Sequence, residues 1–282
     1  MIENINWYPG HMKKTRELIQ ENLKLIDVVV EVVDARIPKS SRNPIIDELV
    51  RGKTRVIAFN KNDLANGAAT ECWLARYREA GIFAVPVNSM SGAGVSNLFH
   101  LLTKLEDELN RERTRKKPLR MMIVGVPNVG KSSLINRMTG HKSAKTGDRP
   151  GVTKGKQWLS LENGMQLLDT PGILWPKFED PKVGLNLAFC GAIKDEILDS
   201  ADLALELIRV LGEDCPDLLV ARYRIDGLGE TPLETMEAIA QKRGFILPGK
   251  KIDYERTART VLDEFRGAVI GRITLERPEA QA

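Results

Sequence analysis

One short segment, Gly125 to Ser132, constrains the fold of this chain more than any other part of its sequence. It reads Gly-Val-Pro-Asn-Val-Gly-Lys-Ser and matches the phosphate-loop pattern G-x-x-x-x-G-K-[ST] at every fixed position. An apolar run over 119–124 precedes it and a helical pattern over 131–139 follows it, which is the context the pattern requires. The segment therefore predicts a strand, a tight glycine loop and a helix whose first amides bind phosphate.

The side chains of this loop have expected roles toward a nucleoside triphosphate. Lys131 is expected to bridge the β- and γ-phosphates and to assist catalysis, and the Ser132 hydroxyl to bind Mg²⁺. The residues around them are expected to contact the phosphates as well: Asn128, Val129, Gly130 and Ser133.

Two further segments are expected to complete the metal site. An apolar run ends at Leu168 and is followed by Asp169-Thr170-Pro171-Gly172. A carboxylate at the end of a strand beside the phosphate loop can hold Mg²⁺, so Asp169 is a predicted metal ligand. The Gly172 amide is expected to reach the γ-phosphate, and Thr153, in the polar loop between the two motifs, is the second predicted protein ligand of the metal.

The base is expected to be guanine. Asn60-Lys61-Asn62-Asp63 follows an apolar run over 55–59 and has the pattern N-K-x-D. The Asp63 carboxylate can accept hydrogen bonds from N1–H and the exocyclic amine of guanine, whereas adenine lacks those donors. The Lys61 stem is expected to lie along the base, and backbone amides of a later loop, at Ser89, Met90 and Ser91, to donate to the guanine O6.

Apolar runs and helical patterns alternate through the first part of the chain, which favours a mostly parallel sheet with helices on both faces. Strands are expected at 27–34, 55–59, 82–87 and 119–124, helices near 44–51, 70–80, 95–112 and 131–139, and a hairpin at 157–161 and 165–168. After residue 183 the strand signal stops, and helices are expected at 200–211, 216–225, 232–243 and 254–266. We therefore expect an α/β P-loop domain over 1–182 and a small all-α domain over 183–282.

The order of the motifs is unusual for a GTPase. The base-reading segments at 60–63 and 89–92 come before the phosphate loop at 125–132, whereas ordinary GTPases have the reverse order. A circular permutation explains this order, since the natural ends of such a domain lie close together. Residues 1–26 would then be an extension, and the basic segment 111–120 the linker that joins the former ends.

The permuted order and several local motifs resemble the circularly permuted GTPases, and within them the ribosome biogenesis GTPase A group. These motifs are Trp7-Tyr8-Pro9-Gly10-His11-Met12, Asp34-Ala35-Arg36-Ile37-Pro38, the phosphate loop, and Phe265-Arg266-Gly267 with Gly271-Arg272. The resemblance implies a cytoplasmic factor that binds a late precursor of the large ribosomal subunit and its rRNA. It also implies a GTPase that is slow alone and is stimulated by that particle.

The catalytic water has no obvious partner in the sequence. Ras-like enzymes carry a glutamine directly after the DTxG motif, but here Ile173 and then Leu174 follow. The resemblance places His11 near the γ-phosphate as a candidate to orient water, and the partner particle is the alternative. Asn128 resembles the loop asparagine of GTPases that bind K⁺ beside the phosphates, so K⁺ is a candidate cofactor in addition to GTP or GDP and Mg²⁺.

Charge and composition add weaker constraints. Residues 1–182 hold 29 basic and 20 acidic residues, whereas 183–241 hold 4 and 12, so any RNA-binding surface of the second domain is expected to be local. Arg259, Arg266 and Arg272 are candidates for such a basic face, with Lys250-Lys251 and the 111–120 linker as further contributors or simply as solvated charge.

Three classes of function remain open at this point. No apolar run reaches membrane-span length, no signal peptide is seen, and the three cysteines form no metal or disulfide pattern, so a soluble monomer in the cytoplasm is expected. A GTPase for ribosome assembly is the preferred interpretation. A GTPase switch with a non-ribosomal client is the alternative, and a P-loop ATPase or kinase is the third.

Overall fold

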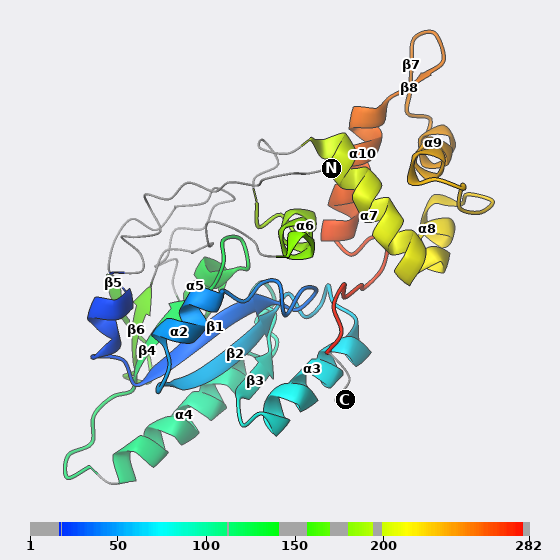
Figure 1. Ribbon diagram of the computed structural model, residues 1–282. Coiled ribbons are helices and arrows are strands. Elements are labelled where there is room, and N and C mark those ends of the chain that lie inside the picture. Colours follow the sequence, from blue (N-terminus) through cyan, green and yellow to red (C-terminus); the bar gives the residue numbers. More distant parts are fainter. Residues whose placement is uncertain are drawn as a thin grey trace.

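The computed structural model describes residues 17, 19–111, 113–140, 157–169, 180–193 and 199–278. Within this part of the chain, six strands form one twisted sheet in the order β3-β2-β1-β4-β6-β5 (Figure 1). Its strands are β1 (Val28–Asp34), β2 (Thr54–Asn60), β3 (Phe83–Pro86), β4 (Arg120–Val124), β5 (Gln157–Ser160) and β6 (Gln166–Asp169).

The centre of the sheet is parallel, as the buried apolar runs predict. β1 pairs in parallel with both β2 and β4, and every one of its residues is buried. β6 pairs in parallel with β4, whereas β5 pairs antiparallel with β6 as the predicted hairpin. The carboxyl ends of β1, β2 and β4 therefore lie at the same edge of the sheet, where parallel sheets bind ligands.

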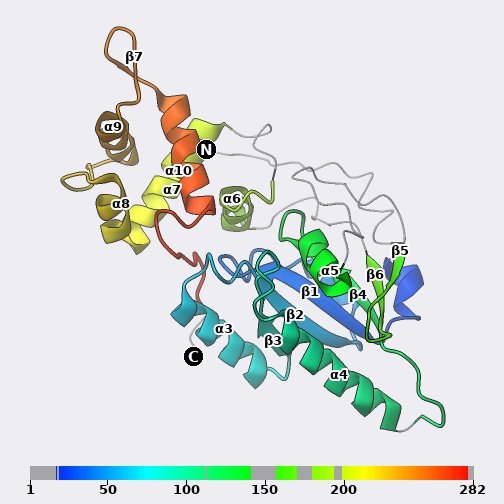
Figure 2. The ribbon, with the colours of Figure 1, turned by 180° about the vertical axis from the view of Figure 1, so that it is seen from behind.

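Helices cover both faces of the sheet, because alternate strand residues point to opposite sides (Figure 2). On one face Val30 and Ala58 belong to the core that includes Leu98 of α4 (Val95–Arg111) and Leu134 of α5 (Lys131–Thr139). On the other face Phe59 packs with Trp73 and Tyr77 of α3 (Gly67–Glu79), and Val29 packs with Ile46 of α2 (Pro44–Leu49). The predicted α/β architecture is confirmed.

The second part of the chain is mainly helical. Its helices are α6 (Pro181–Phe189), α7 (Ser200–Asp214), α8 (Pro216–Tyr223), α9 (Pro232–Arg243) and α10 (Tyr254–Arg266). The sequence patterns did not indicate α6, because Gly184 and Asn186 are weak helix formers. They outweigh the two features that favour a helix start here, the Asp180 cap and the proline that follows it. The expectation that strands end before this part is wrong in one detail. A short hairpin, β7 (Ile246–Leu247) and β8 (Lys251–Ile252), stands between α9 and α10.

After α10 the chain turns back to the sheet. We call residues 270–276 the C-terminal strap; in Figure 1 it is the red segment that runs from the end of α10 toward α3. Ile270, Ile273 and Leu275 of the strap are buried in the same apolar core as α6 and α10. The two parts of the chain are therefore joined by apolar packing at the edge of the sheet where β1 and β2 end.

No helix among the described residues combines the length and the hydrophobicity that a transmembrane segment needs.

Candidate nucleotide-binding site

The phosphate loop lies between β4 and α5, at the ligand-binding edge of the sheet. Gly125 and Gly130 have φ angles of 151° and 93°, in the region that favours glycine. A Cβ atom on Gly125 would lie 2.5 Å from the Val32 carbonyl oxygen, and one on Gly130 would lie 2.2 Å from Nδ2 of the Asn60 side chain. Both glycines are therefore required by the close approach of neighbouring strands as well as by the turn.

No side chain caps the first turn of α5. Gly130 is the N-cap of α5 and supplies no side-chain hydrogen bond. Six other helices are capped by a side-chain oxygen, from Asn43, Asn66, Asp180, Asp199, Thr231 or Asp253. A helix N-terminus that lacks such a cap suits a phosphate group. Ser132 and Ser133 lie half-buried in this first turn.

Lys131 is folded over its own loop. Its side chain is only 8% exposed, and Nζ donates to the Val126 carbonyl oxygen at 3.3 Å. The ammonium group thus already lies among the carbonyl and amide groups of the loop. The role of Lys131 toward the β- and γ-phosphates stays a prediction.

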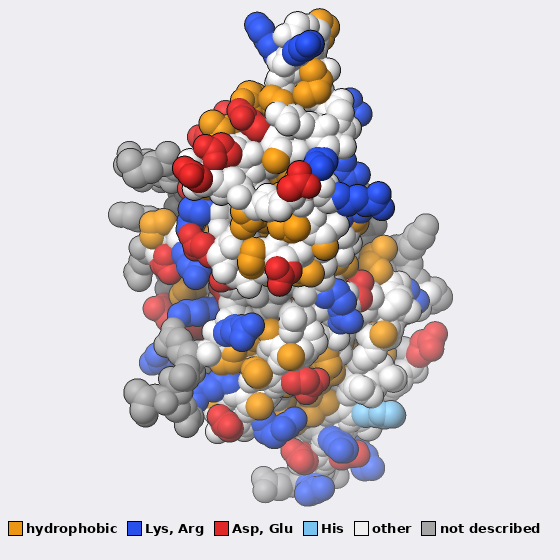
Figure 3. Space-filling model, turned by 90° about the vertical axis from the view of Figure 1, so that its right-hand side faces the viewer, with side chains coloured by type: hydrophobic (Ala, Val, Ile, Leu, Met, Phe, Trp, Pro, Cys, Tyr) orange, Lys and Arg blue, Asp and Glu red, His pale blue; other side chains and the backbone are white. Residues whose placement is uncertain are grey.

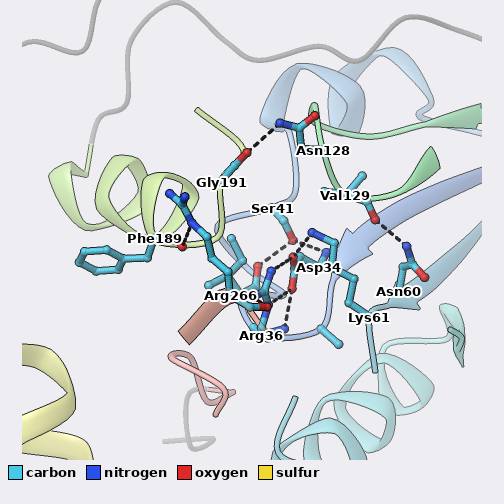
Figure 4. A network of polar contacts seen from close by, with 12 residues as sticks. Asp34, Arg36, Ser41, Asn60, Lys61, Asn128, Val129, Phe189, Gly191 and Arg266 are labelled. Carbon is cyan, nitrogen blue, oxygen red and sulfur yellow. Dashed lines mark hydrogen bonds and ion pairs between the residues drawn. The ribbon is translucent and has the colours of Figure 1, made fainter. Parts of the chain in front are cut away.

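Asn60 connects the three loops that surround the site. Its Nδ2 donates to the Val129 carbonyl oxygen of the phosphate loop at 2.6 Å (Figure 4). Its Oδ1 accepts from the Ser89 amide at 3.0 Å. The side chain is buried, with 1% of the residue exposed. Sequence reasoning assigned Asn60 to nucleotide binding, and the structure adds that it holds the phosphate loop and the two base-reading loops in register.

Asn60 is the first residue of one base-reading loop and contacts the other through the Ser89 amide. We call residues 60–66 the base loop; Asp63 is exposed in it, as a carboxylate that meets an incoming base must be. In the second loop Ser89 is buried and Met90 is 76% exposed. The amides of Met90 and Ser91 both donate to the Asn88 side chain at 2.9 Å, so this loop is held by asparagine side chains, and contact of its amides with O6 stays a prediction.

A buried ionic network, which sequence reasoning did not assign to the site, supports the base loop (Figure 4). Lys61 has a φ angle of 57° and places Nζ 3.0 Å from the Asp34 carboxylate at the end of β1. Asp34 also accepts from Arg36 Nε at 2.9 Å and from a second Arg36 nitrogen at 2.7 Å. Burial raises the pKa of Asp34, but the charges of Arg36 and Lys61 outweigh it and hold that pKa well below its ordinary value.

The same network reaches the helical part of the chain. Arg36 donates to the Arg266 carbonyl oxygen at 3.0 Å, and the Arg266 guanidinium donates to the Ala188 and Phe189 carbonyl oxygens at 3.0 Å. Arg266 thus satisfies carbonyl groups at the end of α6, a usual role for a cation at a helix C-terminus. Arg272 also donates to carbonyl groups of the base loop, so Arg266 and Arg272 are both engaged in bonds within the chain, whereas Arg259 pairs with Glu255 on α10.

The described part of the structure includes only one segment of the predicted metal site, the strand end at Asp169. Asp169 ends β6 and lies opposite Ile123 of β4 in the register of the sheet, two positions before Gly125. The backbone therefore brings this strand end beside the phosphate loop, as predicted. The Asp169 side chain lies outside the described part of the structure, and so do His11, Thr153, Gly172, Ile173 and Leu174.

Asn128 has a φ angle of 59° and turns its side chain toward the helical part. Its Nδ2 donates to the Gly191 carbonyl oxygen at 2.8 Å, just beyond the end of α6 (Figure 4). Because the nitrogen is directed at Gly191, the amide oxygen faces away from it and can accept another donor or a cation.

Comparison with known proteins identifies the family. The chain is 48% identical over 279 residues to the ribosome biogenesis GTPase A of Priestia megaterium, with 97% of each chain covered. The chain belongs to the ribosome biogenesis GTPase A family. The protein of the same name from Thermotoga maritima is 32% identical over 275 residues, which are 98% of this chain and 95% of that one.

A family model and two solved structures agree with this assignment. The model of a family described as 50S ribosome-binding GTPase matches residues 120–237, which start at β4 and exclude the base loop. The solved structure of GDP-bound YlqF covers 93% of this chain and 100% of that one, with a TM-score of 0.67 and 28% sequence identity. The structure of YlqF from T. maritima bound to GNP has a TM-score of 0.66 at 28% identity and covers 94% of this chain and 99% of that one.

Membership of this family settles several sequence-based hypotheses. The protein is a GTPase that binds guanine nucleotide, and its P-loop domain has the circularly permuted motif order. The ATPase or kinase hypothesis is therefore wrong.

Proposed function

We propose that this GTPase is a ribosome assembly factor that binds a late precursor of the large ribosomal subunit, contacts its rRNA, and is released or reset when GTP is hydrolysed. The names of its relatives and the description of the matched family support a ribosomal client. Residue Ile173 stands where a water-orienting glutamine is found in other GTPases, which supports slow hydrolysis alone and stimulation by the particle. The factor would act as a monomer in the cytoplasm.

The proposal divides the chain into a GTPase domain over 1–182 and an RNA-binding helical domain over 183–282. One feature of the helical part supports RNA contact: a hollow of about 400 Å³ lined by Arg222, Tyr223, Arg224, Lys242 and Arg243. Figure 3 shows Lys and Arg side chains on this part of the molecule, both at the tip of the β7–β8 hairpin and on the flank below it. Lysine and arginine side chains in such a group bind the phosphates of a nucleic acid backbone.

The charges around this hollow are only partly neutralised. Glu264 accepts hydrogen bonds from Arg222 at 2.5 Å and from Arg243 at 3.1 Å, so one carboxylate orients two guanidinium groups. Burial raises the pKa of Glu264, but its hydrogen bonds and these two charges lower it overall, so the carboxylate stays ionised near neutral pH. Lys242 lies 3.5 Å from the highly exposed Asp226, and Arg224 follows α8 at an exposed turn. The four cations therefore exceed the acids that face them.

The chemistry of the nucleotide site fits Mg²⁺ and K⁺. We propose that Ser132, Asp169 and Thr153 hold Mg²⁺, since hydroxyl and carboxylate oxygens are its usual ligands and both Ser132 and the end of β6 lie at the phosphate loop. We propose Asn128 as a K⁺ ligand, because its bond to Gly191 turns the amide oxygen away from that carbonyl. When bound, the cations supply positive charge to the phosphates. His11 is proposed to orient the water, with the particle as the alternative source of that group.

Removing two cations from the hollow is expected to weaken particle binding. The double substitution Arg224→Ala and Lys242→Ala should lower the affinity for isolated large ribosomal subunits about tenfold at moderate salt. It should also reduce the slope of log affinity against log salt by roughly 1.4, at about 0.7 per lost phosphate contact. Co-sedimentation in the presence of a non-hydrolysable GTP analogue measures both quantities.

The matched control removes the same charge elsewhere. Arg76→Ala with Arg209→Ala also deletes two cations, whose side chains are 45% and 44% exposed. Equal binding by the two double variants would show that the hollow does not contact the particle. If the unsubstituted protein itself fails to sediment with the subunits, a GTPase switch with a non-ribosomal client becomes the better interpretation.

A further inference from the structure

The C-terminal strap contacts the base loop directly. Arg272 donates from Nε to the Ala65 carbonyl oxygen at 3.0 Å and from a terminal nitrogen to the Asn62 carbonyl oxygen at 2.9 Å. These two carbonyl groups lie on either side of Asp63 in the sequence. The planar guanidinium group of Arg272 therefore spans the turn that carries the base-reading carboxylate.

A second residue of the strap extends this contact. The Asn66 amide at the end of the base loop donates to Thr274 Oγ1 at 3.0 Å. Asn66 also caps α3 by accepting from the Ala69 amide at 3.0 Å. The base loop is thus fixed to the strap at the point where it enters α3.

The strap is itself anchored to the loop that follows β1. The Leu275 amide donates to the Arg36 carbonyl oxygen at 2.8 Å, and the Trp73 indole donates to the Glu276 carbonyl oxygen at 3.0 Å. The Glu276 carboxylate accepts from the Lys39 amide at 2.6 Å and from Asn186 of α6 at 3.1 Å. These bonds connect the strap to the loop after β1, to α3 and to α6, so it has one defined position relative to the base loop.

The other side of the base loop is held by the network described above. Lys61 pairs with Asp34, Asp34 with Arg36, and Arg36 donates to the last residue of α10. Residues from the end of α10 and from the strap therefore support the base loop both before and after Asp63.

We propose that the C-terminal strap is part of the guanine site, and that Arg272 is a positioning residue that holds Asp63 in the geometry required to read the base. A partner that displaces the strap from the sheet would release this loop and speed the loss of guanine nucleotide. The proposal rests on the assignment of Asp63 to the base, and it links the helical part of the chain to nucleotide affinity through named hydrogen bonds.

The test compares two nucleotides that differ at the edge Asp63 reads. Inosine nucleotides lack the exocyclic amine of guanine, so the ratio of GDP to IDP affinity reports how well the carboxylate is placed. Arg272→Ala is expected to lower GDP affinity about tenfold, to speed release of a fluorescent GDP analogue to a similar degree, and to reduce the GDP-to-IDP ratio severalfold. Arg272→Lys, which can still donate to one carbonyl, should recover part of that ratio.

Controls separate positioning from general stability. Arg277→Ala, an exposed arginine just beyond the strap, should keep the GDP-to-IDP ratio of the parent. An equal loss of GDP and IDP affinity in Arg272→Ala, or no loss of either, would overturn the proposal. If Arg272→Ala does not fold, Arg272→Lys and the hydrogen exchange of the base-loop amides decide: unchanged exchange and an unchanged ratio would also overturn it. A parent protein without preference for GDP over IDP would instead refute the role of Asp63.

Discussion

Replacing Asp63 by asparagine is expected to change the nucleotide preference from guanine to xanthine by about two orders of magnitude. In the proposed site the carboxylate accepts two hydrogen bonds from guanine, and each such bond to a charged group contributes about 1.5–3 kcal/mol. The asparagine amide presents a donor where one acceptor stood, which suits the additional carbonyl group of xanthine. Competition of GDP and XDP against a fluorescent nucleotide measures the change.

The matched control for this prediction is Asn62→Ala. Asn62 precedes Asp63, and its buried Oδ1 has no hydrogen-bond partner within the described residues, so loss of that oxygen deletes no hydrogen bond. It should bind GDP as the parent does. Unchanged GDP affinity in Asp63→Asn would show that another residue reads the base, and the guanine assignment of the base loop would have to be abandoned.

The second large effect is expected at Asn60. Substitution by alanine removes the partners of the Val129 carbonyl and the Ser89 amide, both in a buried environment. Each orphaned group costs about 1–3 kcal/mol, so the free energy of unfolding should fall by about 2–6 kcal/mol. GDP affinity should fall at least tenfold, since the phosphate loop and both base-reading loops lose their common anchor.

Asn60→Asp distinguishes this role from simple loss of volume. Aspartate keeps an acceptor for Ser89 but places a second oxygen against the Val129 carbonyl, so it should bind GDP no better than the alanine variant. Denaturant unfolding and nucleotide titration give the two quantities. A stability within about 0.5 kcal/mol of the parent, together with parental GDP affinity, would contradict the bridging role of Asn60.

The sheet and the loops at its edge were predictable because each carries a local signal. The β1 run is apolar throughout since both faces of a central parallel strand are covered, and the phosphate loop combines a fixed spacing with the strand and helix around it. The position of Asp63 just beyond the end of β2 was also predictable, since its motif follows a strand. These predictions depend on residues close together in the sequence.

The supports of the site were not predictable in the same way. Asp34 and Arg36 resemble an ordinary polar strand end, and only the folded chain shows that they hold Lys61. Arg266 and Arg272 were expected at an RNA surface because a charged side chain in a helical region usually faces water. The structure shows them bonded to backbone carbonyls more than 70 residues away in the sequence. Bonds between residues so far apart in the sequence produce no periodic pattern from which they could be predicted.

The measurement that tests the central claim most directly is GTP hydrolysis by the purified protein in K⁺ buffer, with and without isolated large ribosomal subunits. We predict slow turnover alone and strong stimulation by the particle, with a weaker response in Na⁺ buffer. The Arg224→Ala, Lys242→Ala protein should show less stimulation at the same subunit concentration. If the subunits leave the rate unchanged while the protein still binds GTP, the ribosomal assignment is contradicted, and the guanine-nucleotide switch must have another client.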